Sequence, residues 1–391
     1  MTPTKLDPLR EAMAARIAAG GLPGMVLLVA RGTDVHAVAL GTMAFDSDQP
    51  MPRDALFRLG SMTKPILAAA TMVLAEEGAL NLTEPVDRLL PELAGRRVLR
   101  RIDGPLDDTV AAQRPITVLD LLTCRMGYGM VFEPTVEPPY PVINAANELG
   151  LVMGPPDPPT THHPDEWIRR FATLPLMDQP GQRWRYNAGA LVLSVLLARA
   201  AGQPLAEVFQ TRLFEPLGMT STGFTVPADQ THRLPAYYLT NFATMRLERQ
   251  TLSPPDQWAT PPAFPSGAGG LVSTIDDYLS FARLLLNQGV HKGTRLLSAD
   301  SVRLMTSNQI AQAQIAEGGP LLAGRGWGLG LAVTTGPDDI SAPGRYGWDG
   351  GYGTSWFNDP SRNLVAIAMS QTADILFNGT TAQFARLAVL D

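Results

Sequence analysis

Residues 58–78 of the chain, RLGSMTKPILAAATMVLAEEG, join a polar start to a long apolar run. The apolar part is rich in Ala, Leu and Met on nearly all sides, which predicts a helix that is buried on most of its surface. Lys64 lies at the head of this helix, in a chain that has only two other lysines, Lys5 and Lys292. Because arginine carries almost all of the basic character, Lys64 indicates a task that a guanidinium cannot perform, namely losing a proton near neutral pH.

Ser61 precedes Lys64 by three residues, on the same face of the helix predicted for residues 65–77. At the start of a helix, backbone N–H groups can stabilise negative charge on a serine oxygen, and a partly desolvated lysine has a lowered pKa. The pattern Ser-x-x-Lys therefore favours a nucleophile beside its base. The tetrapeptide alone also fits a helix N-cap followed by a lysine with a buried stem, and chance produces this spacing in about one such chain in five.

Other catalytic frameworks are not supported by the sequence. No Gly-x-Ser-x-Gly motif occurs, since GTSWF at 353–357 departs at its last position. The five histidines lack metal-ligand spacing, and Cys124 is the only cysteine, which excludes an internal disulfide and a Cys-rich metal site.

The composition favours small-molecule chemistry. With 391 residues and 45% hydrophobic content, the chain is long enough to bury a large core. The formal net charge is −6 and no run of Lys or Arg occurs, so nothing indicates binding to nucleic acid or anionic lipid. We also expect no membrane span and, since the N-terminal residues lack the pattern of a signal peptide, a cytoplasmic location.

Strand signals occupy the two ends of the chain. Residues 25–40 predict an antiparallel hairpin, and residues 326–334, 353–359 and 363–371 predict three further strands before a closing helix at 380–390. The middle reads as mainly helical, with a Pro-rich passage at 131–164 that is typical of a lid or binding loop. This order predicts one sheet built from both chain ends, covered by terminal helices, with a helical domain inserted.

Several longer stretches carry a family resemblance. They are LFRLGSMTKPILAAATMVLAEEG, ITVLDLLTCRMGYG, PGQRWRYNAGALVLSVLLARAAG, FPSGAGGLVSTIDDYLSFARLLLNQG and YGWDGGYGTSW, in that order. From about Leu22 to the C-terminus the chain resembles the serine β-lactamase-like superfamily, and in particular the family VIII carboxylesterases related to class C β-lactamases. The resemblance implies a β-lactamase-like fold of the α/β plus all-α type: a discontinuous α/β domain with an antiparallel sheet (residues 1–80 and 263–391), an inserted helical domain (81–262), and an active site between them.

The resemblance also implies catalytic roles. Ser61 is matched with the acylated nucleophile, Lys64 with its proton partner, and Tyr186 with the tyrosine of the second motif. We expect the Lys64 ammonium to lower the pKa of Tyr186, so that a phenolate takes the Ser61 proton and later activates water. The backbone N–H groups of Ser61 and Gly351 are expected to form the oxyanion hole.

Two departures from the family pattern bear on the substrate. Asn187 follows the tyrosine directly, so Ala188 stands where an asparagine is expected. The Lys-Thr-Gly motif of β-lactamases is replaced by Trp348-Asp349-Gly350, in which Trp348 offers a flat apolar wall and Asp349 would repel an anion. The substitution favours neutral, moderately apolar esters.

The sequence therefore predicts a serine carboxylesterase that hydrolyses short- to medium-chain esters through an acyl-enzyme, with no metal or organic cofactor. Its expected partner is a small-molecule ester substrate, and neither nucleic acid nor a membrane is expected to bind. Tyr128 and the Pro-rich passage 131–164 are expected to shape the substrate pocket, with Asn187 and the Trp348 motif as further contacts. Three alternatives stay open. A β-lactamase or D-amino-acid peptidase should carry a cation at the Trp348 position, with nearby Arg345 as the candidate substitute. An acyltransferase would use the same acyl-enzyme. A non-catalytic binding or sensor module would have lost the nucleophile, lysine or tyrosine.

Overall fold

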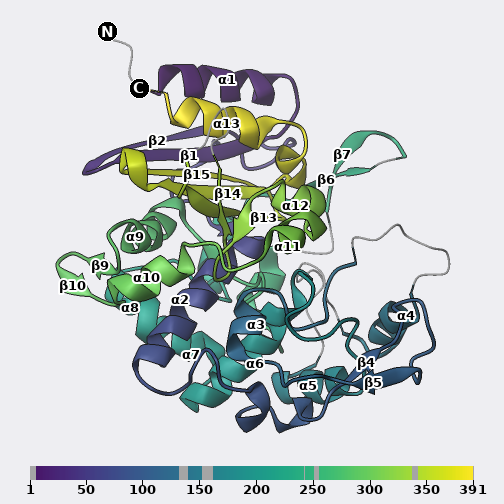
Figure 1. The fold of residues 1–391 in the computed structure, drawn as a ribbon. Coiled ribbons are helices and arrows are strands. Elements are labelled where there is room, and N and C mark those ends of the chain that lie inside the picture. Colours follow the sequence, from purple (N-terminus) through teal and green to yellow (C-terminus); the bar gives the residue numbers. More distant parts are fainter. Residues whose placement is uncertain are drawn as a thin grey trace.

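A seven-stranded antiparallel sheet joins the two ends of the chain (Figure 1). The computed structural model describes residues 6–131, 140–151, 162–241, 243–250, 255–336 and 342–390. The strand order is β11-β12-β13-β14-β15-β1-β2. The strands are β1 (Gly24–Arg31), β2 (Asp34–Gly41), β11 (Gly326–Trp327), β12 (Ala332–Val333), β13 (Tyr346–Gly350), β14 (Thr354–Asp359) and β15 (Leu364–Ser370). The predicted fold class, with a sheet made from both chain ends, is confirmed.

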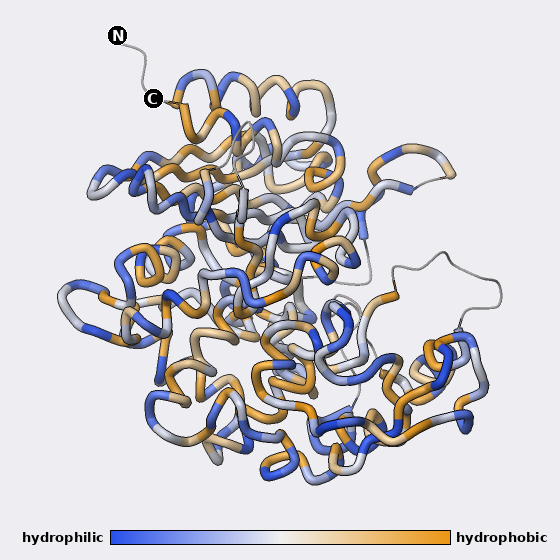
Figure 2. The backbone as a smooth tube through the Cα atoms, in the orientation of Figure 1, coloured by the Kyte–Doolittle hydropathy of each residue, from blue (hydrophilic) through white to orange (hydrophobic). Residues whose placement is uncertain are grey.

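Strand β1 is apolar along nearly its whole length because helices cover both of its faces. Leu27 and Val29 belong to the cluster under α1 (Asp7–Ala18) and α13 (Thr380–Ala388), whereas Val26 and Leu28 belong to the main core around α2 (Thr63–Glu76) and α9 (Ile275–Leu286). Alternate residues of a strand point to opposite faces, so one strand serves two cores. In Figure 2 the central strands are largely hydrophobic, whereas the turn between β1 and β2 is hydrophilic.

The middle of the chain is mainly helical, as predicted. Its helices are α3 (Val118–Leu122), α4 (Pro141–Glu148), α5 (Pro164–Ala172), α6 (Ala188–Ala201), α7 (Leu205–Phe209) and α8 (Glu215–Leu217). Two small hairpins flank these helices in the sequence, β4–β5 (Arg97–Leu99, Thr109–Ala111) before α3 and β6–β7 (Tyr238–Asn241, Arg246–Arg249) after α8. The pairs β3–β8 (Phe57–Arg58, Val272–Ser273) and β9–β10 (Val290–His291, Thr294–Arg295) precede α10 (Ala299–Met305), α11 (Gln312–Glu317) and α12 (Gly319–Leu322).

One predicted strand is wrong in its extent. Residues 326–334 form two short strands, β11 and β12, that pair with each other around a turn. Gly330 in this turn has φ +73°, and a Cβ there would lie 2.7 Å from the backbone oxygen of Lys64. The glycines that looked like part of a strand therefore let the turn approach the first turn of α2.

Some expectations stay untested. The domain boundaries at 80/81 and 262/263 remain a proposal, and within the Pro-rich passage residues 132–139 and 152–161 lie outside the described part of the chain. Across the described ranges no single helix is long and apolar enough to cross a membrane; only α6 taken together with the segment Leu205–Leu217, bent by 77°, has the length and composition.

Candidate active site

Ser61 lies in a short 3-10 turn, η1 (Gly60–Met62), that leads directly into α2. Gly60 has φ +55°, and a Cβ at that position would lie 2.9 Å from the backbone nitrogen of Gly351. Only glycine fits such a conformation and such a close approach. Gly60 thus allows the N-terminus of α2 to pack against the end of strand β13.

Lys64 is buried in the first turn of α2 and faces Ser61. Its side chain is 2% exposed, with Nζ 3.1 Å from Ser61 Oγ and 2.6 Å from the carbonyl oxygen of Ala268. Burial lowers the pKa of Lys64 to about 7, because the charged form loses its hydration. Near neutral pH a large fraction of the amine is therefore neutral, and its lone pair can accept the Ser61 proton.

Tyr186 reaches the site through a strained turn centred on Asn187. Asn187 has φ +83° and ψ −55°, and the N–H of Ala188 donates to the Tyr186 carbonyl at 3.3 Å. This is the less common γ-turn, which a non-glycine residue adopts only when its surroundings hold it. One contact that holds Asn187 in this conformation is a hydrogen bond from its backbone to the buried thiol of Cys124. Burial raises the pKa of this thiol to about 11.

The Tyr186 ring is enclosed by three tryptophans and Lys64. Ring centroids lie 5.6 Å away for Trp184, 5.9 Å for Trp327 and 5.6 Å for Trp348, and Lys64 Nζ lies 4.5 Å from the Tyr186 centroid. The indole N–H of Trp348 donates to the Tyr186 hydroxyl at 2.7 Å. The same hydroxyl is hydrogen-bonded to Ser61.

This enclosure contradicts the expectation of a phenolate. Burial raises the pKa of Tyr186 above its ordinary value, and the hydrogen bonds from Ser61 and Trp348 only partly oppose this effect. Nearby Asp349 raises the pKa of Tyr186 further. Tyr186 is thus a protonated donor near neutral pH, and Lys64 is the group whose pKa suits a base.

The proposed oxyanion hole lies where η1 meets the turn between β13 and β14. The Thr354 hydroxyl donates to the Leu59 carbonyl at 2.9 Å, and Gly353 N–H donates to Gly350 O at 2.8 Å. A Cβ at Gly350 would lie 1.9 Å from the Leu59 oxygen. These contacts hold the backbone of Gly351 beside that of Ser61, as two N–H groups sharing one oxyanion require.

Trp348 and Asp349 lie beside these groups with partners of their own. The Trp348 ring is 2% exposed, packs edge-on to Trp327 with centroids 4.7 Å apart, and lies 5.4 Å from the guanidinium carbon of Arg325. Asp349 accepts a hydrogen bond from the Ser355 hydroxyl at 2.6 Å. Contacts of Trp348, Asp349, Gly350 and Asn187 with substrate stay predictions.

Trp184 and Trp327 were missed by the sequence analysis. Trp184 stands two residues before Tyr186 in RWRY, a spacing that places both rings on one side of an extended chain. Trp327 lies on the edge strand β11, and nothing in the sequence around it indicates its contact with Tyr186.

Tyr128 does not line the site, contrary to our expectation. Its side chain is 1% exposed, its hydroxyl donates to the Val142 carbonyl at 3.3 Å, and its ring packs edge-on against Phe171. Two residues later, however, the N–H of Met130 donates to the Tyr186 carbonyl at 2.9 Å. The segment after Tyr128 therefore supports Tyr186 through its backbone, while the phenol belongs to the core around α5.

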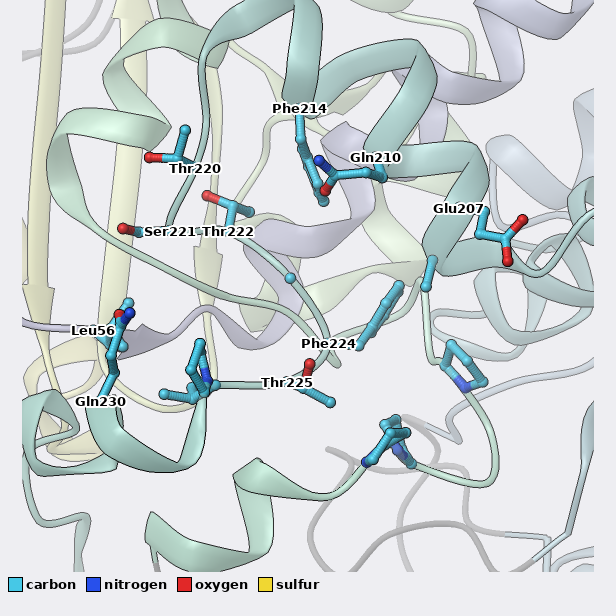
Figure 3. A pocket seen from close by; sticks show the side chains of 17 residues that line it. Leu56, Glu207, Gln210, Phe214, Thr220, Ser221, Thr222, Phe224, Thr225 and Gln230 are labelled. Carbon is cyan, nitrogen blue, oxygen red and sulfur yellow. The ribbon is translucent and has the colours of Figure 1, made fainter.

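A separate pocket of about 490 Å³ lies beside α7 and contains none of these residues (Figure 3). Phe214, Phe224 and several prolines line it, with Glu207 at its rim. Ser61, Lys64 and Tyr186 therefore lie outside this pocket. Across the described ranges, no group of three His, Cys, Asp or Glu side chains could hold a metal ion.

Replacing Trp348 by phenylalanine should lower kcat for an ester about tenfold, because the hydroxyl of Tyr186 loses the hydrogen bond that fixes its direction. KM should change little, since the replacement keeps an aromatic ring in a nearly covered position. Steady-state kinetics check this, with Trp258→Phe, a change of the same kind in a different apolar cluster, as the control. A rise in KM with unchanged kcat would instead identify Trp348 as a substrate wall.

Comparison with known proteins gives one family and several relatives. The Beta-lactamase family model matches residues 9–390. An uncharacterized protein of Mycobacterium tuberculosis is 39% identical over 363 residues, which cover 90% of this chain and 86% of that protein. Esterase EstB of Burkholderia gladioli is 30% identical over 405 residues, 95% of each chain. The solved structure of EstCE1, described as a hydrolase with promiscuous acyltransferase activity, superposes with a TM-score of 0.81 at 26% identity and covers 98% of both chains.

Proposed function

Since the chain belongs to the β-lactamase family, we propose that it is a serine carboxylesterase acting on short- to medium-chain carboxylic esters. The broader class, an acyl-enzyme serine hydrolase or acyltransferase of this family, rests on the family match and on relatives that are named esterases. The observation that carries the proposal is the buried Lys64 amine, 3.1 Å from Ser61 Oγ and with a pKa lowered to about 7.

Acylation begins with the neutral amine of Lys64. It takes the Ser61 proton while Oγ attacks the ester carbonyl, and the N–H groups of Ser61 and Gly351 stabilise the negative oxygen that forms. Collapse of this intermediate breaks the bond to the alcohol. The departing oxygen takes the proton of the Tyr186 hydroxyl, and the Lys64 ammonium returns a proton to Tyr186, so both groups end as they began.

Deacylation repeats these steps with water in place of the alcohol. Water gives a proton through Tyr186 to Lys64 while its oxygen attacks the acyl carbon. When the second intermediate collapses, the Lys64 ammonium returns a proton to Ser61 Oγ and the carboxylic acid leaves. An alcohol that reached the same position would be acylated instead, which is the acyltransferase alternative and fits the activity described for EstCE1.

The surroundings of Trp348 favour neutral esters over β-lactams. Trp348 and Asp349 stand where the family's lysine would bind a substrate carboxylate, and Asp349 lies close enough to Tyr186 to raise its pKa. Arg345, the candidate for a substitute cation, has its guanidinium carbon 3.4 Å from the ring centroid of Phe357. Phe357 belongs to the cluster under α1 and α13, on the opposite face of the sheet from Trp348. Arg345 therefore does not replace the missing lysine.

A substrate panel tests the proposal. We expect turnover of p-nitrophenyl acetate, butyrate and octanoate to exceed that of nitrocefin by at least about 100-fold in kcat/KM, equivalent to about 3 kcal/mol of transition-state stabilisation. Each assay should be repeated with Ser61→Ala, which measures the turnover that does not use the nucleophile. Nitrocefin turnover above that of every ester would refute the esterase proposal, and transfer to added methanol in preference to hydrolysis would favour the acyltransferase.

A further inference from the structure

We propose that a second binding site, for a small organic anion, lies at the end of the sheet opposite to Ser61. A pocket of about 550 Å³ opens there between α9, the β1–β2 turn, the start of β15 and the hairpin β9–β10. Figure 1 shows α9 and the β9–β10 hairpin on the same side as the β1–β2 turn. A pocket of this size is in the range of sites that bind small organic molecules.

The pocket is cationic in a protein that is negatively charged overall. Arg283, His291 and Lys292 line it, and no carboxylate is among the described residues that do so. The net charge of the whole chain is −6, so a cluster of basic side chains without a carboxylate is opposite in sign to the protein as a whole. Burial lowers the pKa of His291, and the charges of Lys292 and Arg283 lower it further, which places the three groups within electrostatic reach of one another.

In the part of the chain that the structure describes, no anionic partner is found for His291 or Arg283. His291 Nε2 is buried and finds no hydrogen-bond partner in the part of the chain that the structure describes. The hydrogen bond found for Arg283 goes from Nη2 to the carbonyl oxygen of Gly32 at 2.8 Å. A guanidinium has five N–H donors, so Arg283 keeps further donors for an anion in the pocket that it lines.

Lys292 occupies a backbone position that does not suit lysine. The strands β9 and β10 pair Thr294 with His291, so Lys292 and Gly293 form a two-residue turn, with φ of +46° and +83°. Such a type I′ turn favours Asn, Asp or Gly at its first central position. A chain that has three lysines places one of them here, where a smaller residue would fit better, which indicates that the charge has a use.

The remaining lining describes the body of the ligand. Ala30, Leu279, Leu286 and Val365 supply apolar surface, while Ser280 and Asn287 add neutral hydrogen-bonding groups. Inorganic phosphate would leave most of such a pocket unfilled. The chemistry fits an acidic head, carboxylate or phosphate, attached to an apolar body of several carbon atoms.

The strand directions place this site away from the reactive serine. β13 ends at Gly350, beside Ser61, and β14 begins there at Thr354. Because the strands alternate in direction, the end of β1 and the start of β15 lie at the other end of the sheet. An anion bound there would not compete directly with an ester at Ser61, so this site does not depend on the proposed function.

Histidine NMR tests the proposal on the full protein, labelled with ¹³C at histidine Cε1. At constant ionic strength, sodium octanoate and octyl phosphate should move the His291 signal, assigned with His291→Gln, and leave that of His232 in place. Neutral 1-octanol and inorganic phosphate should have at least about tenfold weaker effects, because each offers only half of the required chemistry. Comparing octanoate with octyl phosphate identifies the preferred head group.

Matched variants locate the binding. Lys292→Asn, which suits the turn, should weaken octanoate binding about fivefold, and Arg283→Gln about tenfold, while Lys292→Arg should change it less than twofold. Melting temperatures establish that each variant is folded. An equal response to 1-octanol, or unchanged octanoate affinity in folded Lys292→Asn, would overturn the proposal.

Discussion

Replacing Ser61 by alanine should lower kcat for p-nitrophenyl butyrate by about 10⁴-fold or more, because no other group can form the acyl-enzyme. The fold should survive, since Ser61 is only half-buried and alanine fits a helix start. In the wild type, mass spectrometry after a rapid quench should find one acyl group per chain on the peptide that contains Ser61. The variant should show none.

Ser47→Ala is the matched control for this change. Ser47 is a half-buried serine, like Ser61, that accepts a hydrogen bond from the N–H of Gln49, and its loss should leave kcat within about twofold of the wild type. If Ser61→Ala kept more than about 1% of wild-type turnover beside an unchanged control, the nucleophile would have to be another residue.

Replacing Lys64 by arginine should lower kcat/KM by about 10³-fold, because a guanidinium does not give up its proton in the accessible pH range. The wild type should gain activity as the pH rises through about 7, where the Lys64 amine becomes neutral, and should level off above it. The variant should stay nearly inactive at every pH. Assays of kcat/KM between pH 5 and 9 measure both curves.

Lys64→Met separates this effect from a loss of folding, because its side chain fills a similar space without a charge that must be buried. It should be folded and as inactive as Lys64→Arg, while Lys292→Arg should keep full activity. Between pH 7 and 10.5 the unfolded chain binds a proton at Lys64 that the folded chain has lost, so this lysine makes the wild type more stable as the pH rises. That contribution should be absent in Lys64→Met. Activity above a tenth of wild type in either variant would exclude Lys64 as the base.

Much of the fold was predictable because its signals are local. The hairpin of residues 25–40, the helix after Ser61 and the closing helix are each indicated by nearby residues alone, and β1, β2, α2 and α13 follow these predictions closely. The family resemblance also implied that Ser61, Lys64 and Tyr186 share one site, and the structure brings these three side chains together. Their catalytic roles stay proposals until the variants are measured.

The electrostatics of the site could not be predicted from the motifs. Whether Tyr186 is a phenol or a phenolate depends on the tryptophans packed around it, and these come from positions 184, 327 and 348, which only the tertiary structure unites. The pKa of Lys64 shifts in the opposite direction, downward, and burial is again the cause. Tyr128 was misplaced for a related reason, since a sequence does not say on which side of a loop an aromatic ring will pack.

The pairing of β1 with β15 has a consequence for how the protein is made. All of the residues from Met25 to Arg31 pair with partners between Leu364 and Ser370, more than 330 positions later in the chain. A ribosome adds about 5 to 20 residues per second, so β1 waits roughly 20 to 70 s for the partner strand that completes its hydrogen bonds. During that time its apolar residues and one free edge are open to other chains. We therefore expect the yield of folded enzyme in a cell to depend on factors that shield the nascent N-terminal hairpin.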